Sequence, residues 1–192
     1  MKASHTIRPV FDDPNLMSAA GLVPAMLLAE SAGLHDLLEE RLDMASPNAT
    51  PKASSVVGGM LAGADSIDDL DGLRHGGMDR LFVGVRASST LGTFLRSFTH
   101  GHVQQLDAVG AGLLAGLAGR VPGVIAGADT REGLAFLDVD DTIREVHGYA
   151  KQGAGYGYTR VRGLNIQLAT LSTPLTAPVI CRARLRKGST SS

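Results

Sequence analysis

The sequence predicts an α+β protein in which a helical N-terminal region precedes a set of β-strands. Up to about residue 120 the apolar residues recur every three or four positions, which is typical of amphipathic helices. Between about residues 164 and 185 they recur at every second position, which is typical of half-buried strands. The charge changes as well: residues 1–133 hold 10 basic and 15 acidic residues, and residues 134–192 hold 8 basic and 4 acidic. We therefore expect a helical region over 1–130, a strand region over 131–188 and a disordered tail over 189–192.

The first helices are predicted from apolar spacing and from helix-ending residues. Residues 18–42 fit two helices that break near Ser31-Ala32-Gly33. A proline-containing linker is expected over 43–52, and a short helix over 53–64. Ser66 and Asp69 form an S-x-x-D pattern, which predicts the capped start of a further helix that runs through Leu73.

Two more helices are expected before residue 130. In the segment 88–98 the residues Leu91, Phe94, Leu95 and Phe98 share one face, and a polar face opposite them carries Ser89, Thr93, Arg96 and His100. A longer helix is expected over 102–120, where four glycines loosen it at about 1 kcal/mol each relative to alanine. Its inward residues are predicted to be Val103, Leu106, Leu113, Leu114 and Leu117.

The strands begin with the apolar run 134–137, which predicts a buried strand that carries carboxylates at its C-terminal end. Residues 149–158 are rich in glycine and tyrosine and are predicted to form a loop. The alternating segments 164–171 and 177–185 are joined through Ser172-Thr173-Pro174, so we expect them to form an antiparallel pair.

Composition excludes several classes of protein. The single cysteine, Cys181, cannot form a disulfide within the chain, so a disulfide-stapled secreted domain is excluded. The longest uncharged apolar run, residues 108–119, is too short for a membrane span, and the N-terminus shows no signal-peptide pattern. We expect a cytoplasmic protein with no membrane partner. The net charge of -1 also argues against a generally polybasic nucleic-acid binder.

Catalytic chemistry is most strongly indicated by the aspartates at 138, 140 and 141. Three carboxylates within four residues repel one another unless a cation or a proton intervenes. Asp138 and Asp140 project to the same side of a strand, while Asp141 projects to the other. Such a pair suits Mg²⁺, which takes one or two carboxylates and keeps several waters. The alternative is a solvated turn in which Asp141 or Thr142 caps the next segment.

Two enzyme classes carry aspartates on a strand of this kind. In a phosphotransferase of the haloacid-dehalogenase type, whose h-h-h-h-D-x-D-x-T signature residues 134–142 resemble, Asp138 is the expected nucleophile and Asp140 the acid/base. In an RNase-H-like nucleotidyl transferase a strand aspartate holds one of two Mg²⁺ ions. The first class needs a parallel sheet with a helix directly after the motif, whereas a loop and two alternating strands follow here. We favour the second class.

Several longer segments together resemble the DDE transposases of bacterial insertion sequences, specifically the insertion-sequence thirteen-eighty group, over nearly the whole chain. The resemblance rests on residues 60–70, 88–96, 98–107, 137–142, 162–165, 168–174 and 177–180. It implies a helical N-terminal region followed by an RNase-H-like domain whose Asp-Asp-Glu triad cuts and joins transposon ends with Mg²⁺. The implied partners are the DNA of the terminal inverted repeats and a second copy of the chain.

The resemblance places the first triad aspartate in this cluster, at Asp140 or alternatively at Asp138, which makes both of them metal ligands. The other two acids are expected well downstream, and no Asp or Glu follows Glu145. We therefore expect a truncated transposase that cannot catalyse strand transfer alone. The alternative function is a DNA-binding or dimerising remnant without catalytic activity.

DNA contacts are expected from basic and hydroxyl side chains. Ser89, Thr93 and Arg96 on the polar helix face, with Arg86 just before it, could enter a major groove, or they could be an ordinary solvated surface. The row Arg182, Arg184, Arg186 and Lys187 could follow a DNA backbone or guard a strand edge. His100 and His102 are interpreted as part of a surface turn rather than as metal ligands. The tyrosines of the glycine-rich loop could stack on nucleic acid or pack on the sheet.

Overall fold

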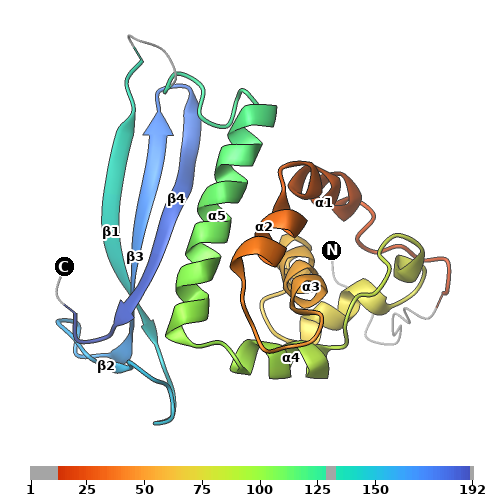
Figure 1. Cartoon of the computed structure of the whole chain (residues 1–192), viewed down its shortest axis with the longest axis horizontal. Coiled ribbons are helices and arrows are strands. Elements are labelled where there is room, and N and C mark those ends of the chain that lie inside the picture. Colours follow the sequence, from red (N-terminus) through yellow and green to blue (C-terminus); the bar gives the residue numbers. More distant parts are fainter. Residues whose placement is uncertain (1–12, 129–132, 191–192) are drawn as a thin grey trace, which may run out of the picture. The chain divides into compact units, whose positions relative to one another are not determined.

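The computed structural model describes residues 13–128 and 133–190, and the chain divides into two compact units (Figure 1). The helical unit consists of Met1–Leu27 and Ser46–Ser97. The helix–sheet unit consists of Leu28–Ala45 and Phe98–Ser192. The expected boundary at residues 130 and 131 lies outside the described residues. The long helix before it groups with the strands and with the helical segment 34–41 rather than with the helices of residues 46–97.

The helical unit is built from short helices joined by turns. It contains the first part of α1 (Leu22–Ser31), then α3 (Ala49–Leu61), the 3₁₀ helices η1 (Asp68–Arg74) and η2 (Met78–Arg80), and α4 (Ser88–Arg96). The expected linker over 43–52 is wrong at its end, because α3 begins at Ala49 and includes Pro51. A proline is tolerated there because the first N–H groups of a helix have no partner within the helix.

The core of the helical unit is apolar. Leu22, Leu73 and Met78 pack together, and Met78 is fully buried. On α4 the side chains of Leu91 and Phe94 are buried, as the helical spacing predicts, but Leu95 is 38% exposed. The apolar face of α4 is therefore covered over its first turns and not at Leu95 near its end.

The predicted cap at Ser66 is confirmed, and the helix that follows it is the 3₁₀ helix η1. The Ser66 hydroxyl donates to Asp69 Oδ2 at 2.6 Å, and the Asp69 N–H donates back to Ser66 Oγ at 3.3 Å. The hydrogen bond from the Ser66 hydroxyl to the carboxylate holds the pKa of Asp69 below its usual value.

In the helix–sheet unit, α2 (Leu34–Arg41) packs against α5 (His100–Arg120). The predicted break between the first two helices is confirmed at Gly33, which has a φ of 96°. A Cβ atom at Gly116 of α5 would lie 2.1 Å from the Ala32 carbonyl oxygen, so glycine lets the two segments approach closely. Gly110 and Gly119 have open space around them, whereas Gly116 also permits this close approach, which its predicted loosening of the helix does not describe.

The buried face of α5 differs from the predicted one. The residues predicted to point inward are only half-buried, and Val109 is the buried apolar residue of this helix. The helix begins at His100, two residues earlier than expected, because Thr99 and His102 form a capping box ahead of it.

The sheet contains β1 (Phe136–Glu145), β2 (Gly155–Tyr156), β3 (Arg162–Thr173) and β4 (Thr176–Lys187), and all its pairs are antiparallel. The central strand β3 pairs with β1 along one side and with β2 and β4 along the other. The predicted antiparallel pair of segments 164–171 and 177–185 is confirmed as β3 and β4. The molecule is thus an α+β protein.

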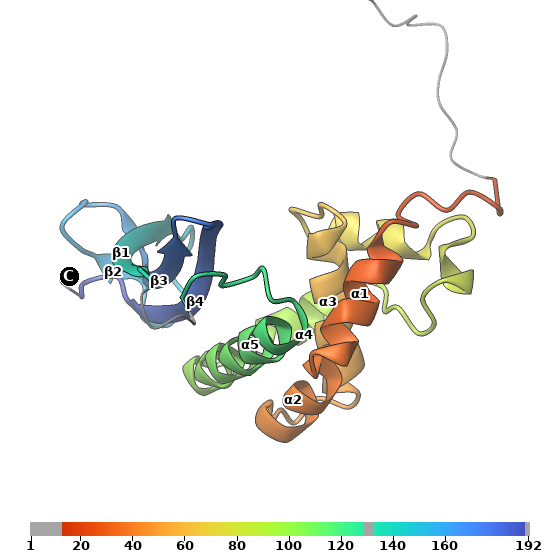
Figure 2. The ribbon, with the colours of Figure 1, turned by 90° about the horizontal axis from the view of Figure 1, so that it is seen from above.

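Helix α5 lies alongside β4 (Figures 1 and 2). Asp107 of α5 accepts hydrogen bonds from the Arg182 guanidinium at 3.0 Å and from the Ala183 N–H at 3.2 Å. The Asp107 carboxylate therefore satisfies a backbone N–H on the outer edge of β4. This hydrogen bond hinders the pairing of that edge with another strand.

The sheet differs from the helical unit in what it buries. In the described part of β1 to β4 no apolar side chain is buried, whereas the polar side chains of Asn165 and Thr173 are. Residues 189 and 190, expected to belong to a disordered tail, are part of a turn in which the Thr190 N–H donates to the Lys187 carbonyl, and residues 191 and 192 lie outside the described residues. Within 13–128 and 133–190, no helix has the length and apolarity that crossing a membrane requires.

Candidate metal-binding and DNA-binding residues

The aspartate cluster lies on β1, but in the middle of an exposed edge strand. The predicted buried strand is wrong: Phe136, Leu137 and Val139 are 53–65% exposed. The aspartates do not lie at the end of the strand either, because β1 continues to Glu145. The physical reason is that, among the described elements, β1 packs mainly against β3, its partner within the sheet, so the side chains that project from its faces remain in solvent.

Asp140 interacts with the open edge of its own strand. The Val146 N–H donates to the Arg162 carbonyl of β3, so every second residue back along β1, including Asp140, directs its N–H toward β3. The Asp141 N–H therefore points to the open edge, where it donates to Asp140 Oδ1 at 2.8 Å. One edge donor is satisfied by a neighbouring carboxylate.

Asp141 belongs to a polar network on the opposite face of the sheet. Its carboxylate pairs with the Arg186 guanidinium of β4, and these side chains are 12% and 19% exposed. The buried Asn165 of β3 links them: its Nδ2 donates to Asp141 Oδ2 at 3.4 Å, and its Oδ1 accepts from Arg186 Nε at 3.1 Å. Three strands are thus joined by one charge-assisted network.

This network distinguishes the three aspartates. Asp141 is engaged with Arg186 and Asn165, whereas Asp138 and Asp140 are exposed and, by the alternation of the strand, share the other face. Two carboxylates fit the one or two that Mg²⁺ commonly takes from a protein. No cluster of three or more His, Cys, Asp or Glu residues suited to a metal is present in the described part of the chain.

The basic row on β4 is divided among different interactions. Arg182 pairs with Asp107 of α5 and Arg186 with Asp141 of β1, whereas Arg184 is exposed. Two of the cations that were expected to follow a DNA backbone are therefore engaged in ion pairs within the unit.

The candidate DNA-binding residues of α4 lie on its exposed side. Ser89, Thr93 and Arg96 are exposed, and the Thr93 hydroxyl donates to the Ser89 carbonyl at 3.1 Å. Arg86 is half-buried before the helix begins, and its Nε atom is buried without a hydrogen-bond partner. The structure therefore groups three of the four residues on one surface and separates Arg86 from them.

The two histidines near α5 are engaged with their own helix. The Thr99 N–H donates to His102 Nδ1 at 3.0 Å, and His100 Nε2 lies 3.0 Å from Gln104 Nε2. His102 therefore acts as a helix cap.

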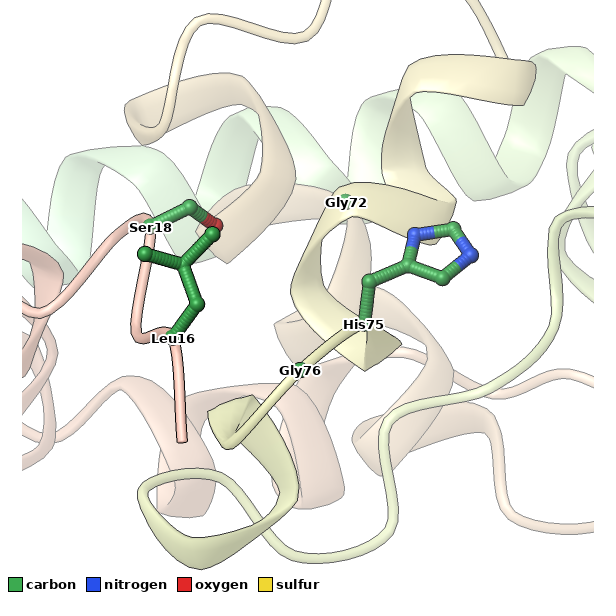
Figure 3. Close-up of a pocket in the computed structure, with 5 residues that line it drawn as sticks. All are labelled: Leu16, Ser18, Gly72, His75 and Gly76. Atoms are coloured by element: carbon green, nitrogen blue, oxygen red, sulfur yellow. The ribbon is translucent and has the colours of Figure 1, made fainter. Parts of the chain in front are cut away.

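A hollow of about 440 Å³ in the helical unit is lined by Leu16, Ser18, Gly72, His75 and Gly76. Figure 3 shows Leu16 and Ser18 on one side of it and His75 on the other. None of the site residues predicted from the sequence lines this hollow.

Sequence reasoning missed Asn165 and Asp107, which organise the acidic and basic side chains of the sheet. The alternation of β4 indicated that Arg182, Arg184 and Arg186 share a face, but their partners depend on the register between strands and on the position of α5. Neither is encoded by a local pattern.

Comparison with known proteins gave no match: no family model, no curated protein and no solved structure is similar to this chain at a significant level.

Proposed function

We propose that this chain is part of a DDE transposase that acts on the DNA ends of an insertion sequence in the cytoplasm. The observation that carries the proposal is the separation of the aspartates on β1. Asp141 is paired with Arg186 and Asn165, which leaves Asp138 and Asp140 together on the exposed face. A site for phosphodiester chemistry needs hard oxygen ligands that DNA can reach, and this face provides them.

The sheet supports this proposal over the phosphotransferase. A haloacid-dehalogenase-type enzyme requires its aspartates at the end of a strand in a parallel sheet, with a helix directly after them. Here the strand continues past the aspartates, a loop follows, and the described sheet is antiparallel. The order β1-β3-β4 fits the antiparallel opening of an RNase-H-like sheet, which is the fold that we propose.

Asp140 is the proposed triad member, with Asp138 beside it as a second ligand for Mg²⁺. When bound, the metal stabilises charge on the phosphodiester oxygens and favours deprotonation of the attacking group. The sequence contains no acid after Glu145, so these residues do not complete a triad by themselves. We propose that the chain binds DNA and metal but does not cut or join DNA alone.

The metal site is tested by titrating Mg²⁺ or Mn²⁺ into the purified chain by calorimetry. Asp140→Asn and Asp138→Asn should each remove most of the binding heat. The matched control is Glu145→Gln, which removes an exposed acid from the same strand outside the pair and should leave binding unchanged. Equal losses of binding heat in all three variants would mean that the metal responds to the negative charge of the strand and not to a specific site. Mg²⁺-dependent cutting or joining of end DNA by the chain alone would overturn the proposal that it lacks catalytic activity by itself.

DNA binding is proposed to use the exposed side of α4. The measurement is the affinity for duplex DNA of the terminal repeats as a function of salt. Arg96→Ala should weaken binding and reduce the slope of log K against log salt by about 1, because one phosphate contact is lost. Arg80→Ala, which removes an exposed arginine of the same unit on η2, is the control.

The second candidate function is a non-catalytic DNA-binding or dimerising protein. It is favoured by the helical unit, in which Leu91 and Phe94 of α4 are buried without involvement of the aspartates. End-DNA binding that is unchanged in Asp140→Asn, together with no metal-dependent heat in the unsubstituted chain, would favour this candidate. Sedimentation of the chain with and without DNA measures whether it forms the homo-oligomer that the transposase proposal includes.

A further inference from the structure

The segment between β1 and β3, predicted to be a loop but containing the short strand β2, carries all three tyrosines of the chain, and each of them is exposed. Tyr149 is 95% exposed, Tyr156 is 68% exposed and Tyr158 is fully exposed. The sequence allowed these rings either to pack on the sheet or to remain available for stacking. Their exposure excludes packing on the sheet, so the three rings are accessible in solvent.

The glycines of this loop explain why its tyrosines point outward. Tyr156 and Tyr158 alternate with glycines, and the glycine side lies against the chain that follows β4. A Cβ atom at Gly157 would come within 2.4 Å of the Gly188 carbonyl oxygen, and the Gly188 N–H donates to the Gly153 carbonyl at 3.0 Å. Because glycine lets the backbones touch on this side, the alternate side chains face solvent.

An arginine lies over one of the rings and is held by backbone carbonyls. The Arg162 guanidinium lies 5.4 Å from the centre of the Tyr149 ring, and Arg162 pairs directly across the strands with Tyr156. Its Nη1 atom also donates to the carbonyls of Val146, at 3.4 Å, and Gly148. These two carbonyls hold the cation in place beside the Tyr149 ring.

The surrounding charge is positive. Lys151 and Arg160 are exposed on the same loop, and Arg160 adopts a φ of 58° in a turn that its N–H closes onto the Gly157 carbonyl. No acid occurs in the sequence after Glu145, which lies on β1 opposite Gly163. The loop therefore presents aromatic faces together with one cation held by carbonyls and two exposed cations, and the acid of the chain that precedes it most closely is Glu145 at the end of β1.

We propose that this loop, residues 146–162, binds single-stranded DNA by stacking unpaired bases on its tyrosines while Lys151 and Arg160 contact the phosphates. Every base has a π-face, and aromatic side chains with a basic surround are the common means of binding unpaired strands. A duplex fits less well, because its bases are already stacked on one another. The identification of the polymer as DNA rests on the proposed function, whereas the stacking rests on the loop itself.

The chain offers a selective spectroscopic test because it contains three tyrosines and no tryptophan. In the full chain labelled with 3-fluorotyrosine, every ¹⁹F signal comes from this loop. Titration with oligothymidylate should shift these signals upfield as bases stack on the rings. Duplex DNA of the terminal repeats and the polyanion heparin serve as the comparison ligands.

Variants separate stacking from charge. Tyr158→Ala should weaken oligothymidylate binding by about 5- to 100-fold, since one stacked base is lost. Tyr158→Phe keeps the ring and should stay within about twofold of the unsubstituted chain. Arg160→Gln should reduce the salt dependence by about 0.7 in the slope, the value for one phosphate contact on a single strand. Tyr158 is fully exposed, so its replacement should leave the melting temperature unchanged.

The outcomes distinguish this proposal from the proposed function. Heparin binding as tight as that of oligothymidylate, or equal affinities of Tyr158→Ala and Tyr158→Phe, overturns the stacking proposal. Duplex binding that depends on Arg96, with no ¹⁹F shift by any oligonucleotide, overturns the loop site and leaves the transposase proposal standing. Oligothymidylate binding that depends on the ring at Tyr158, without any duplex binding, supports the loop and removes the proposed role of α4.

Discussion

In the helical unit the interior is made of leucine, methionine and phenylalanine side chains, whereas the sheet of the other unit has a polar network in its most buried place. Met78 and Leu91 are fully buried in the first, and Asn165 is 3% exposed in the second. The difference follows from what each element needs. A helix satisfies its own backbone and is held in a fold by its apolar stripe, so it must find a partner surface. A sheet joins its strands by backbone hydrogen bonds, and β1 to β4 are joined with their apolar side chains still partly in solvent.

The largest difference between the two regions is expected when a leucine is replaced by alanine in each and the free energy of unfolding is compared. Leu91→Ala removes a fully buried side chain from the helical unit and should lower the free energy of unfolding by about 2–5 kcal/mol. Leu137→Ala removes a 65% exposed side chain from β1 and should change it by less than about 1 kcal/mol. Urea denaturation followed by circular dichroism measures both. Similar losses in the two variants would contradict the comparison.

The polar network of the sheet should be the next most sensitive point. Asp141→Ala leaves the Arg186 guanidinium and the Asn165 amide without their shared acceptor, so we expect a loss of about 2–3 kcal/mol. Asp138→Ala, on the exposed face of the same strand, should stay within about 0.5 kcal/mol. If Asp141→Ala left the free energy of unfolding unchanged, the backbone hydrogen bonds between the strands would be sufficient to hold the sheet together without this network.

Two glycines of α5 should respond to replacement by alanine with stability changes of opposite sign. Gly116→Ala places a Cβ atom 2.1 Å from the Ala32 carbonyl oxygen, so the segments must move apart, at a cost of about 1–3 kcal/mol. Gly110→Ala meets open space and should stabilise the chain by up to about 1 kcal/mol through helix propensity. Thermal melts of the two variants should therefore shift in opposite directions, and a stabilising Gly116→Ala would rule out the close approach.

The smallest effects are expected from two carboxylates of η1, the exposed Asp69 and the half-buried Asp71. Hydrogen bonds from Ser66 lower the pKa of Asp69, and a hydrogen bond from Arg74 lowers the pKa of Asp71. Since each folded pKa lies below the unfolded value, their stabilising contribution is fully present above the unfolded pKa of about 3.9 and is lost as the pH falls through the folded pKa.

Carboxyl carbon NMR titration measures these pKa values directly. Ser66→Ala should return the pKa of Asp69 toward its usual value and leave that of Asp71 unchanged. Arg74→Ala should do the reverse. A common shift of both carboxyls in either variant would indicate a general charge effect instead of the individual hydrogen bonds.

Local patterns in the sequence were sufficient for much of the fold. The break at Gly33, the cap formed by Ser66 and Asp69, and the antiparallel pair β3 and β4 were all predicted, because each depends on residues close together in the chain. The alternation that separates Asp141 from Asp138 and Asp140 was predicted for the same reason.

Burial could not be predicted in this way. Residues 134–137 have the composition of a buried strand, yet Phe136 and Leu137 are exposed, because what covers a strand is set by elements far away in the chain. Leu95 was assigned to the buried face of α4 by its spacing, and its exposure depends on where the surrounding helices end.

The sequence by itself determined the order of helices and strands, the positions of the aspartates and the concentration of tyrosines in one loop. Tertiary structure alone decided that Asp141 is bound by Arg186 and Asn165, that Gly116 lies against Ala32, and that the tyrosines face solvent. The physical reason is the range of the interactions. Periodicity and capping act over a few residues, whereas strand register, close packing and exposure depend on contacts between residues that are distant in the chain.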